Sequence, residues 1–270
     1  MGHKPETSEV ISSLQNPKVK NTIALKKSRE RKKQNLFVVE GRREIERAFQ
    51  AGYEFSKIFI SPEFDDEVIF GYFNDDPHRP EIYHVTKQVY AGMAYREDTE
   101  GIIGWAVSQK HVLPDIRLSS NPLILVVDAI EKPGNLGAIL RTADAAGVDA
   151  LIISDPRTDV YNPNVIRSSL GAVFTTQLGV GTVQEVIQWL KEHHIKIYCT
   201  ALTASNPYVE VDYQQSVAIV MGTEATGLSE AWLDQSDQNI IIPMHGIVDS
   251  INVSVSAGIV LFEALRQRTG

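Results

Sequence analysis

The sequence has one cysteine and no long apolar run. Cys199 is the only cysteine among 270 residues, so the chain cannot form an internal disulfide, and a reducing compartment is expected. Nowhere do ~18 consecutive apolar residues occur, which is the length that a membrane-spanning helix needs. The first residues are polar, which argues against a secretory signal. We therefore expect a cytoplasmic protein without a membrane partner.

Two nucleotide-binding motifs and a metal-ligand pattern are also missing. The glycine pattern G-x-G-x-x-G of dinucleotide-binding folds is absent, and so is the phosphate-binding loop G-x-x-x-x-G-K-[ST]. The missing glycine fingerprint disfavours a nicotinamide-dependent dehydrogenase. His193 and His194 are adjacent, but no matching ligand cluster accompanies them, so no metal is expected.

Negative charge dominates the chain overall but not its N-terminal part. The net charge is −8, yet residues 1–50 hold twelve Lys and Arg against six Glu, a local charge of +6 that leaves −14 for the remainder. Eight of these cations lie within residues 18–33, opposed only by Glu30. Such a density suits contacts with RNA phosphates, although a solvated helix face would have the same pattern. The candidate RNA-binding residues are Lys18, Lys26, Lys27, Arg29, Lys32, Lys33 and Arg42.

The first part of the chain has the pattern of a small α/β domain. The apolar run at residues 37–39 predicts a strand, Glu40 and Gly41 indicate a turn, and helical spacing of apolar residues follows. Further strands are predicted at 57–60 and 101–107. We expect a domain over residues 1–108, followed by a linker over residues 109–120, where polar residues and proline interrupt any periodicity.

The pattern from residue 121 to residue 270 predicts a second α/β domain with a parallel sheet. Short continuous apolar runs alternate with helical segments, which is typical of parallel strands covered on both faces. The last helix is predicted over residues ~252–267, where Val255, Ile259 and Phe262 share one face. The predicted strands are 123–127, 150–153, 195–199, 217–221 and 239–242.

Residues 131–143 follow the first of these strands, at the end of the sheet where open α/β folds bind ligands. Asn135 could cap the next helix and Gly134 could form the turn, which would explain both residues without a function. Arg141 lies away from the apolar stripe of the same helix, so core packing does not explain it. An exposed arginine on a helix is nevertheless common, and this segment alone is not specific.

Two more polar segments follow later strands. In residues 220–228, Gly222 lets the backbone approach a ligand closely, and Glu224 could accept hydrogen bonds from a ribose or hold a neighbouring cation. Residues 241–256 lead from a strand through a loop into the last helix, where Ser250 or Asn252 could simply be the N-cap. Each segment alone is a weak signal.

Together, in this order and at strand ends, the three segments resemble the SpoU (TrmH-like) family of the SPOUT methyltransferase superfamily. The resemblance covers about residues 121–270, and residues 9–107 resemble the family's ribosomal-protein-like substrate-binding domain. It implies a SPOUT-type parallel sheet with a deep trefoil knot, S-adenosylmethionine as the cofactor, and a homodimer. Topology rules alone would not have suggested a knot.

The functional positions of the family carry over residue by residue. The resemblance implies that Arg141 is the catalytic arginine, and that Asn135, Glu224 and Asn252 are the other polar residues of the active site. The family usually has Leu where Ile251 stands, a departure that bears on substrate identity more than on activity. The implied cofactor-binding residues are Gly222, Ile242, Ile251, Met244 and Ala201.

The implied reaction is transfer of a methyl group to a ribose 2′-hydroxyl of RNA. This hydroxyl is a poor nucleophile at neutral pH, so the enzyme must orient it and disperse the developing charge. Arg141 suits that task, but a guanidinium is a poor base; His245 is one candidate base, and its identity stays open. The separate N-terminal domain favours 23S ribosomal RNA over transfer RNA. An RNA-binding protein of the same fold without transfer activity is the alternative.

Overall fold

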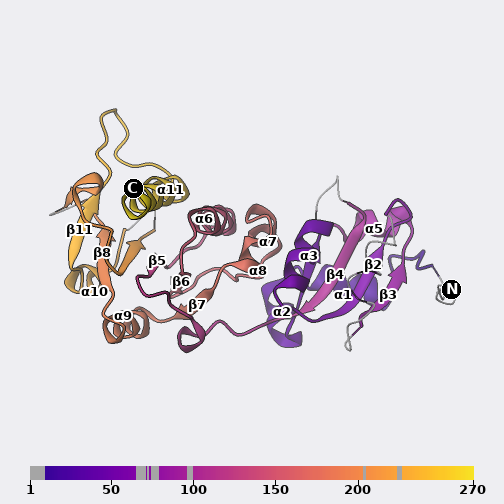
Figure 1. Cartoon of the computed structure of the whole chain (residues 1–270). Helices are drawn as coiled ribbons and strands as arrows, with labels where there is room; N and C mark the ends of the chain where they lie inside the picture. The colour runs from indigo at the N-terminus through magenta and orange to yellow at the C-terminus, as the bar shows by residue number, and fades with distance from the viewer. Residues whose placement is uncertain are drawn as a thin grey trace. The chain divides into compact units, whose positions relative to one another are not determined.

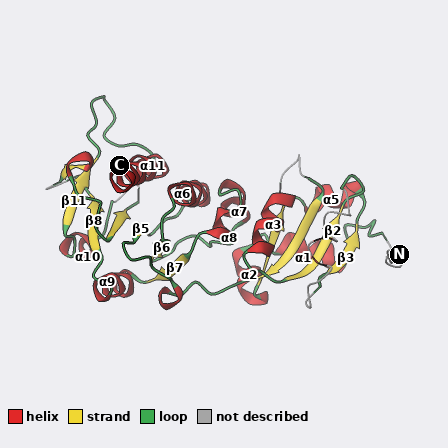
Figure 2. Ribbon diagram, viewed as in Figure 1, coloured by secondary structure: helices red, strands yellow, loops and turns green. Residues whose placement is uncertain are grey.

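The computed structural model describes residues 10–64, 71, 73, 79–95, 100–202, 205–223 and 227–270. The chain divides into two units, whose helices and strands are drawn in Figures 1 and 2. Unit 1 comprises residues 1–109 and 161–171, and unit 2 comprises residues 110–160 and 172–270. Within the described ranges, no helix is both long enough and apolar enough to cross a membrane.

Unit 1 is built on a four-stranded mixed sheet with the strand order β1-β4-β2-β3. The strand β4 is antiparallel to β1 and to β2, and the edge strand β3 is parallel to β2. Three of these strands were predicted from the sequence; β3 was not, because none of its four residues is buried. The elements are α1 (Pro17–Ala24), α2 (Ser28–Gln34), β1 (Leu36–Glu40), α3 (Arg42–Gln50), β2 (Phe55–Ile60), β3 (Glu81–His84), α5 (Lys87–Met93), β4 (Ile102–Val107) and α7 (Pro163–Ser168).

The two faces of this sheet are covered by different segments. One face carries Val38 and Trp105 and packs against α1 and α5. Thr22 of α1 is fully buried there, and its hydroxyl accepts a hydrogen bond from the Trp105 indole nitrogen at 3.0 Å. The opposite face carries Phe37, whose ring stacks on Tyr161 with 4.1 Å between the ring centroids.

Residues 161–171 dock on unit 1 although they come from the middle of the chain. The hydroxyls of Tyr53 and Tyr161 lie 3.2 Å apart, and the guanidinium of Arg47 donates to the carbonyl of Leu170. Gly171 has a φ of +83°, and a Cβ there would lie 3.0 Å from the Arg47 side chain. The chain therefore passes between the units three times, after residues 109, 160 and 171.

Unit 2 is built on a seven-stranded sheet with the order β7-β6-β5-β10-β8-β11-β9, in which every pairing is parallel. The predicted parallel sheet and its five predicted strands are confirmed; the short strands β7 and β9 were not predicted. The elements are η1 (Leu113–Asp115), β5 (Leu123–Asp128), α6 (Pro133–Ala146), β6 (Ala150–Ser154), α8 (Ala172–Thr175), β7 (Leu178–Gly181), α9 (Val183–Glu192), β8 (Lys196–Thr200), β9 (Asn206–Pro207), η2 (Tyr208–Glu210), β10 (Val217–Met221), α10 (Glu230–Asp234), β11 (Gln238–Ile241) and α11 (Val253–Thr269).

Helices cover both faces of the parallel sheet, as the continuous apolar runs of its strands require. In Figure 1, α6 and α11 lie on one side of the sheet and α9 and α10 on the other. The second face forms a core that includes Trp189 of α9 and Trp232 of α10. Residues 110–119, which precede β5, also belong to this unit: Leu113 is buried in the same core, and the Ser119 amide donates to Asp149 at 2.8 Å.

Arg268 fastens the end of α11 to the rest of unit 2. Its guanidinium donates to the carbonyl oxygens of Asn121 (2.7 Å), Tyr213 (2.8 Å), Pro122 (3.1 Å) and Gln215 (2.5 Å). Burial lowers the pKa of Arg268, while Asp149 and Asp212 oppose that shift. One side chain thus joins the last helix to the segments that enter β5 and β10.

Candidate functional site

A cavity of about 490 Å³ lies at the carboxyl ends of the neighbouring strands β10, β8 and β11. Its walls come from the segments that follow these three strands and from the first two turns of α11. This is the edge at which open parallel sheets bind ligands. The cavity is lined by Thr200, Ala201, Leu202, Tyr208, Met221, Gly222, Thr223, Gly227, Leu228, Leu233, Ile240, Ile241, Ile242, Met244, Asp249, Ser250, Ile251, Val253, Ser256 and Val260.

All five residues that the family resemblance assigns to the cofactor line this one cavity. Ala201 follows β8, Gly222 follows β10, and Ile242 follows β11. Met244 and Ile251 stand in the long loop between β11 and α11, which projects from unit 2 in Figure 1. Residues more than 40 positions apart in the sequence are therefore brought together by the parallel order of three strands.

Gly222 occupies a position that has no room for a side chain. A Cβ atom there would overlap the carbonyl carbon of Gly227 and would lie 2.5 Å from the amide nitrogen of Leu228. The approach is fixed by a narrow turn, in which Thr223 and Gly227 exchange two backbone hydrogen bonds of 3.1 Å. Glu224, a candidate catalytic residue, lies outside the residues that the structure describes.

Asn135 and Asn252 meet through their side chains. Asn252 is the N-cap of α11, and its side-chain oxygen accepts hydrogen bonds from the Ser254 amide (2.9 Å) and hydroxyl (2.6 Å). Its amide nitrogen is left to donate to the side-chain oxygen of Asn135, in the first turn of α6, at 3.3 Å. Capping and the contact between the two helices thus use opposite ends of one amide.

Arg141 is exposed on α6, as the helical pattern predicted. Among the residues that the structure describes, its side chain makes no hydrogen bond or ion pair. At ~100° and ~1.5 Å per residue, it lies about 120° around the helix from Asn135 and about 9 Å along the axis. The structure therefore joins Asn135 to Asn252 but does not bring Arg141 into contact with either.

Two histidines singled out in the sequence, His245 and His193, are both exposed but differ in their surroundings. His245 is exposed in the loop between β11 and α11, and the loop brings its neighbour Met244 to the cavity wall. His193 ends α9, where its Nδ1 lies 2.8 Å from the Trp189 carbonyl oxygen. Across the described part of the chain, no group of three or more His, Cys, Asp and Glu is placed to hold a metal ion.

The basic cluster of unit 1 contains both structural and exposed cations. Arg31 is buried and donates to the carbonyl oxygens of Leu25 (3.0 Å) and Lys26 (2.8 Å), which ends α1. The Lys26 ammonium donates to the Ala94 carbonyl at 2.8 Å, and Lys18 lies over the Tyr83 ring at 4.8 Å from its centroid. The remaining candidates are exposed: Lys27, Arg29, Lys32, Lys33 and Arg42.

Sequence reasoning missed several residues that line the cavity. Thr200 ends β8, and its hydroxyl donates to the Val220 carbonyl at 3.0 Å, which ties two strand ends together. Tyr208 belongs to η2, in a stretch without periodicity, so no pattern pointed to it. Ser256 and Val260 follow the N-cap of α11 by one and two turns, a helical spacing that could have indicated them.

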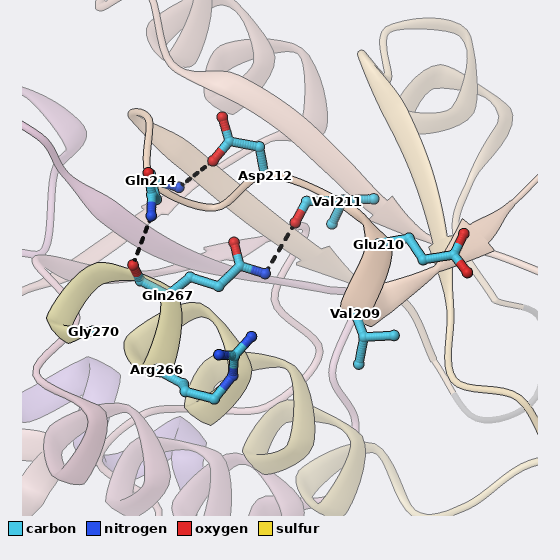
Figure 3. Close-up of a pocket in the computed structure, with 8 residues that line it drawn as sticks. All are labelled: Val209, Glu210, Val211, Asp212, Gln214, Arg266, Gln267 and Gly270. Atoms are coloured by element: carbon cyan, nitrogen blue, oxygen red, sulfur yellow. Dashed lines mark hydrogen bonds between the residues drawn. The ribbon is translucent and has the colours of Figure 1, made fainter.

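A second hollow, of about 480 Å³, lies between residues 209–214 and the end of α11 (Figure 3). The Gln267 amide donates to the Val211 carbonyl at 3.1 Å, and the Gln214 amide donates to the Gln267 carbonyl at 3.0 Å. Arg266 forms an ion pair with Glu263 at 2.8 Å. These polar groups bind one another and the backbone, so they hold α11 in place.

A parallel α/β unit with a cavity at its strand ends and a second α/β unit with exposed cations define a two-domain α/β protein with a candidate small-molecule site. Comparison with known proteins gives the family. Residues 122–262 match the SpoU rRNA Methylase family, and residues 16–104 match the MRM3-like substrate binding domain. The chain belongs to the SpoU rRNA methylase family.

Individual relatives cover almost the whole chain. The 23S rRNA (guanosine(2553)-2′-O)-methyltransferase RlmP of Bacillus subtilis is 31% identical over 252 residues, which cover 93% of this chain and 97% of the relative. A solved RNA 2′-O ribose methyltransferase is 38% identical, with a TM-score of 0.84 over 96% of this chain and 99% of the other. An AdoMet-bound rRNA methyltransferase from Sinorhizobium meliloti is 27% identical, with a TM-score of 0.89 over 97% and 99% of the two chains.

Proposed function

We propose that this protein transfers a methyl group from S-adenosylmethionine to a ribose 2′-hydroxyl of 23S ribosomal RNA, at a guanosine. The observation that carries the proposal is the single cavity that collects all five cofactor positions of the family. The guanosine and the 23S molecule come from RlmP, which spans nearly the same length as this chain. We place the activity in the cytoplasm, where a lone buried cysteine stays reduced.

The cavity suits S-adenosylmethionine in size and chemistry. Ligand sites of 300–1,000 Å³ with mostly apolar walls and a few polar groups are typical for molecules of this size. Leu228, Ile242 and Val260 provide apolar wall for a planar base, while Ser250 and Ser256 provide hydroxyl groups. The cofactor would supply an electrophilic methyl group on a sulfonium. Backbone groups at Gly222, Ile242 and Ile251 would hold the cofactor.

The polar residues that the resemblance assigns to the active site would divide the work of the reaction. Arg141 would position the 2′-hydroxyl or the adjacent phosphate and stabilise the negative charge that develops on the oxygen. A guanidinium presents several donors in a fixed fork, which suits that role and not proton removal. Asn252 and Asn135 would orient substrate through the amide pair at the start of α6 and α11. Glu224 would hold Arg141 or the ribose.

We further propose a trefoil knot and a homodimer. The knot is supported by the way the chain after β11 wraps one cavity and then returns as α11 against α6. The dimer is supported by the outer side of α11, where Val255 is 52% exposed and Phe262 is 48% exposed. An apolar helix face of this kind is typical of an interface between two copies. Light scattering should therefore give a particle of about 60 kDa, twice the chain mass of 30.0 kDa.

Unit 1 would bind the RNA, through the domain that we assign to residues 1–108. The exposed cations of α2 would contact phosphates, which holds RNA without reading its sequence. Transfer RNA is the second candidate substrate. A catalytically silent RNA-binding protein is the second candidate function, disfavoured because Arg141, Glu224 and Asn252 are all present in the sequence.

The decisive experiment maps 2′-O-methyl groups in the RNA of cells that lack the gene. One guanosine of 23S ribosomal RNA should lose its methyl group. Wild-type protein should restore the group, and the Arg141→Ala variant, expressed to the same level, should not. Calorimetry on the full-length chain should show S-adenosylmethionine binding for both proteins. Loss of methylation in transfer RNA alone would move the proposal to that substrate, and an unchanged map with no cofactor binding would refute it.

A further inference from the structure

We propose that Tyr95 of unit 1 is a stacking platform for an unpaired base of the RNA, with Lys27 and Arg42 placed for the flanking phosphates. The inference rests on the proposed function, since RNA is the ligand that it invokes. It adds a base contact to a domain whose other candidate contacts are made with phosphates. Nothing in the sequence patterns pointed to this residue.

Tyr95 combines an exposed ring with a fixed backbone. Its side chain is 48% exposed, yet its amide donates to the Glu40 carboxylate at 2.7 Å. The preceding residue, Ala94, donates its amide to the Tyr90 carbonyl at 2.8 Å and accepts a hydrogen bond from the Lys26 ammonium at 2.8 Å. Three elements thus hold the backbone at this point: β1, α5 and the segment between α1 and α2. Because the backbone is already held here, base stacking would have to order only the side chain of Tyr95.

The carboxylates of Glu40 and Glu100 accept hydrogen bonds from backbone amides, whereas Lys27 and Arg42 are exposed to solvent. Glu40 binds the Tyr95 amide and stands close enough to Lys26 to raise its pKa, against a larger lowering by burial. Glu100 accepts the amide of Arg42 at 2.6 Å. Lys27 and Arg42 are exposed, and their side chains have no ion pair with any residue that the structure describes. Both cations are therefore available to phosphate.

This arrangement fits a nucleic acid better than a protein surface. Single-stranded RNA is recognised by aromatic rings that stack on splayed bases, next to cations that follow the backbone. A protein partner would need a contiguous apolar patch, whereas the side chains that hold the backbone at Ala94 and Tyr95 are the charged Lys26 and Glu40. Exposure of one aromatic residue is common in itself. The fixed backbone and the flanking cations are what distinguish this one.

The test compares RNA affinities of full-length variants for a short single-stranded RNA of mixed sequence. Tyr95→Ala should weaken binding about 5- to 100-fold, the range expected for one lost stack. Tyr95→Phe should bind as the wild type does, because the ring remains. Ile23→Ala is the matched control: Ile23 is an apolar residue of the same unit, 39% exposed on α1, and its loss should leave affinity unchanged. Melting temperatures of all three should match the wild type.

Two further measurements separate a base contact from a phosphate contact. On an RNA whose central residues lack bases, the wild type and Tyr95→Ala should bind equally. The slope of log affinity against log salt should stay unchanged in Tyr95→Ala, whereas Lys27→Gln should reduce it by about one unit per lost phosphate contact. Equal affinity of wild type and Tyr95→Ala for intact RNA would overturn this inference alone. Absence of RNA binding by the wild type would overturn the proposed function with it.

Discussion

Replacement of Gly222 by alanine tests the geometry of the cavity directly. The added methyl group would lie 2.5 Å from the Leu228 nitrogen, about 1 Å short of an ordinary van der Waals contact, and would overlap the Gly227 carbonyl. Backbone atoms have no alternative rotamer, so the backbone of Gly227 and Leu228 must shift by roughly that distance. Overpacking of this kind costs about 1–3 kcal/mol of stability. The larger effect should be on function, because a displacement of ~1 Å in a reacting geometry can cost ~10²-fold in rate.

The same substitution elsewhere in unit 2 provides the control. Gly246 lies in the loop between β11 and α11, and a Cβ there would meet no atom within 4 Å. We expect Gly222→Ala to bind S-adenosylmethionine at least ten-fold more weakly and to lose about 100-fold in single-turnover methyl transfer, with Gly246→Ala near wild type in both. Calorimetry, thermal melting and transfer of labelled methyl to RNA would measure these effects on the same samples. Wild-type affinity and rate in Gly222→Ala would refute the reasoning.

Three other predictions concern single side chains. Arg141→Ala should lower single-turnover transfer about 10²–10³-fold, as loss of one oxyanion donor does, while stability changes by less than about 0.5 kcal/mol; rescue by Arg141→Lys would contradict the bidentate role. Arg268→Met removes four hydrogen bonds to carbonyl groups, so at about 1 kcal/mol each, discounted for partial exposure, it should cost about 2–3 kcal/mol in urea unfolding; Arg266→Met should cost less, because the Arg266 side chain is 69% exposed and, within the described part of the chain, bonds to Glu263 alone. Burial lowers the pKa of His111 from 6.5 to about 4. The free energy of unfolding should therefore be unaffected above pH 6.5 and should fall by about 2–3 kcal/mol towards pH 4, because only the unfolded chain takes up the proton in that range. A His111→Gln protein with the same acid profile would contradict this.

The sequence was informative where one physical rule decides the structure. Continuous apolar runs predicted β5, β6, β8 and β10, because a strand buried on both faces has few polar positions. The strand β11 was predicted as well, although only Ile240 of its four residues is buried. Spacing along α6 correctly left Arg141 outside the core. The short strands β7 and β9 were missed because a few residues carry no periodicity.

The site required knowledge that no single segment contains. The family resemblance assigned one cofactor site to Ala201, Gly222 and Ile242. The parallel strand order explains how these three residues come to line the same cavity. Tyr208 could not be predicted, because it reaches the cavity from an irregular segment. The extent of the basic surface was overestimated: Lys26 looks like its neighbours in the sequence, yet its ammonium group is tied to a backbone carbonyl.

Because the chain passes between its two units three times, a single truncation cannot isolate either unit intact. Unit 1 is assembled from two separate stretches, so a single cut at residue 109 would leave the Phe37 ring without Tyr161 and the Arg47 side chain without the Leu170 carbonyl. A fragment that starts at residue 118 would also lose Leu113 from its own core. Because unit 1 is discontinuous in the sequence, no single cut separates the two units. A chimera that takes unit 1 from a relative has to include residues 161–171 together with residues 1–109.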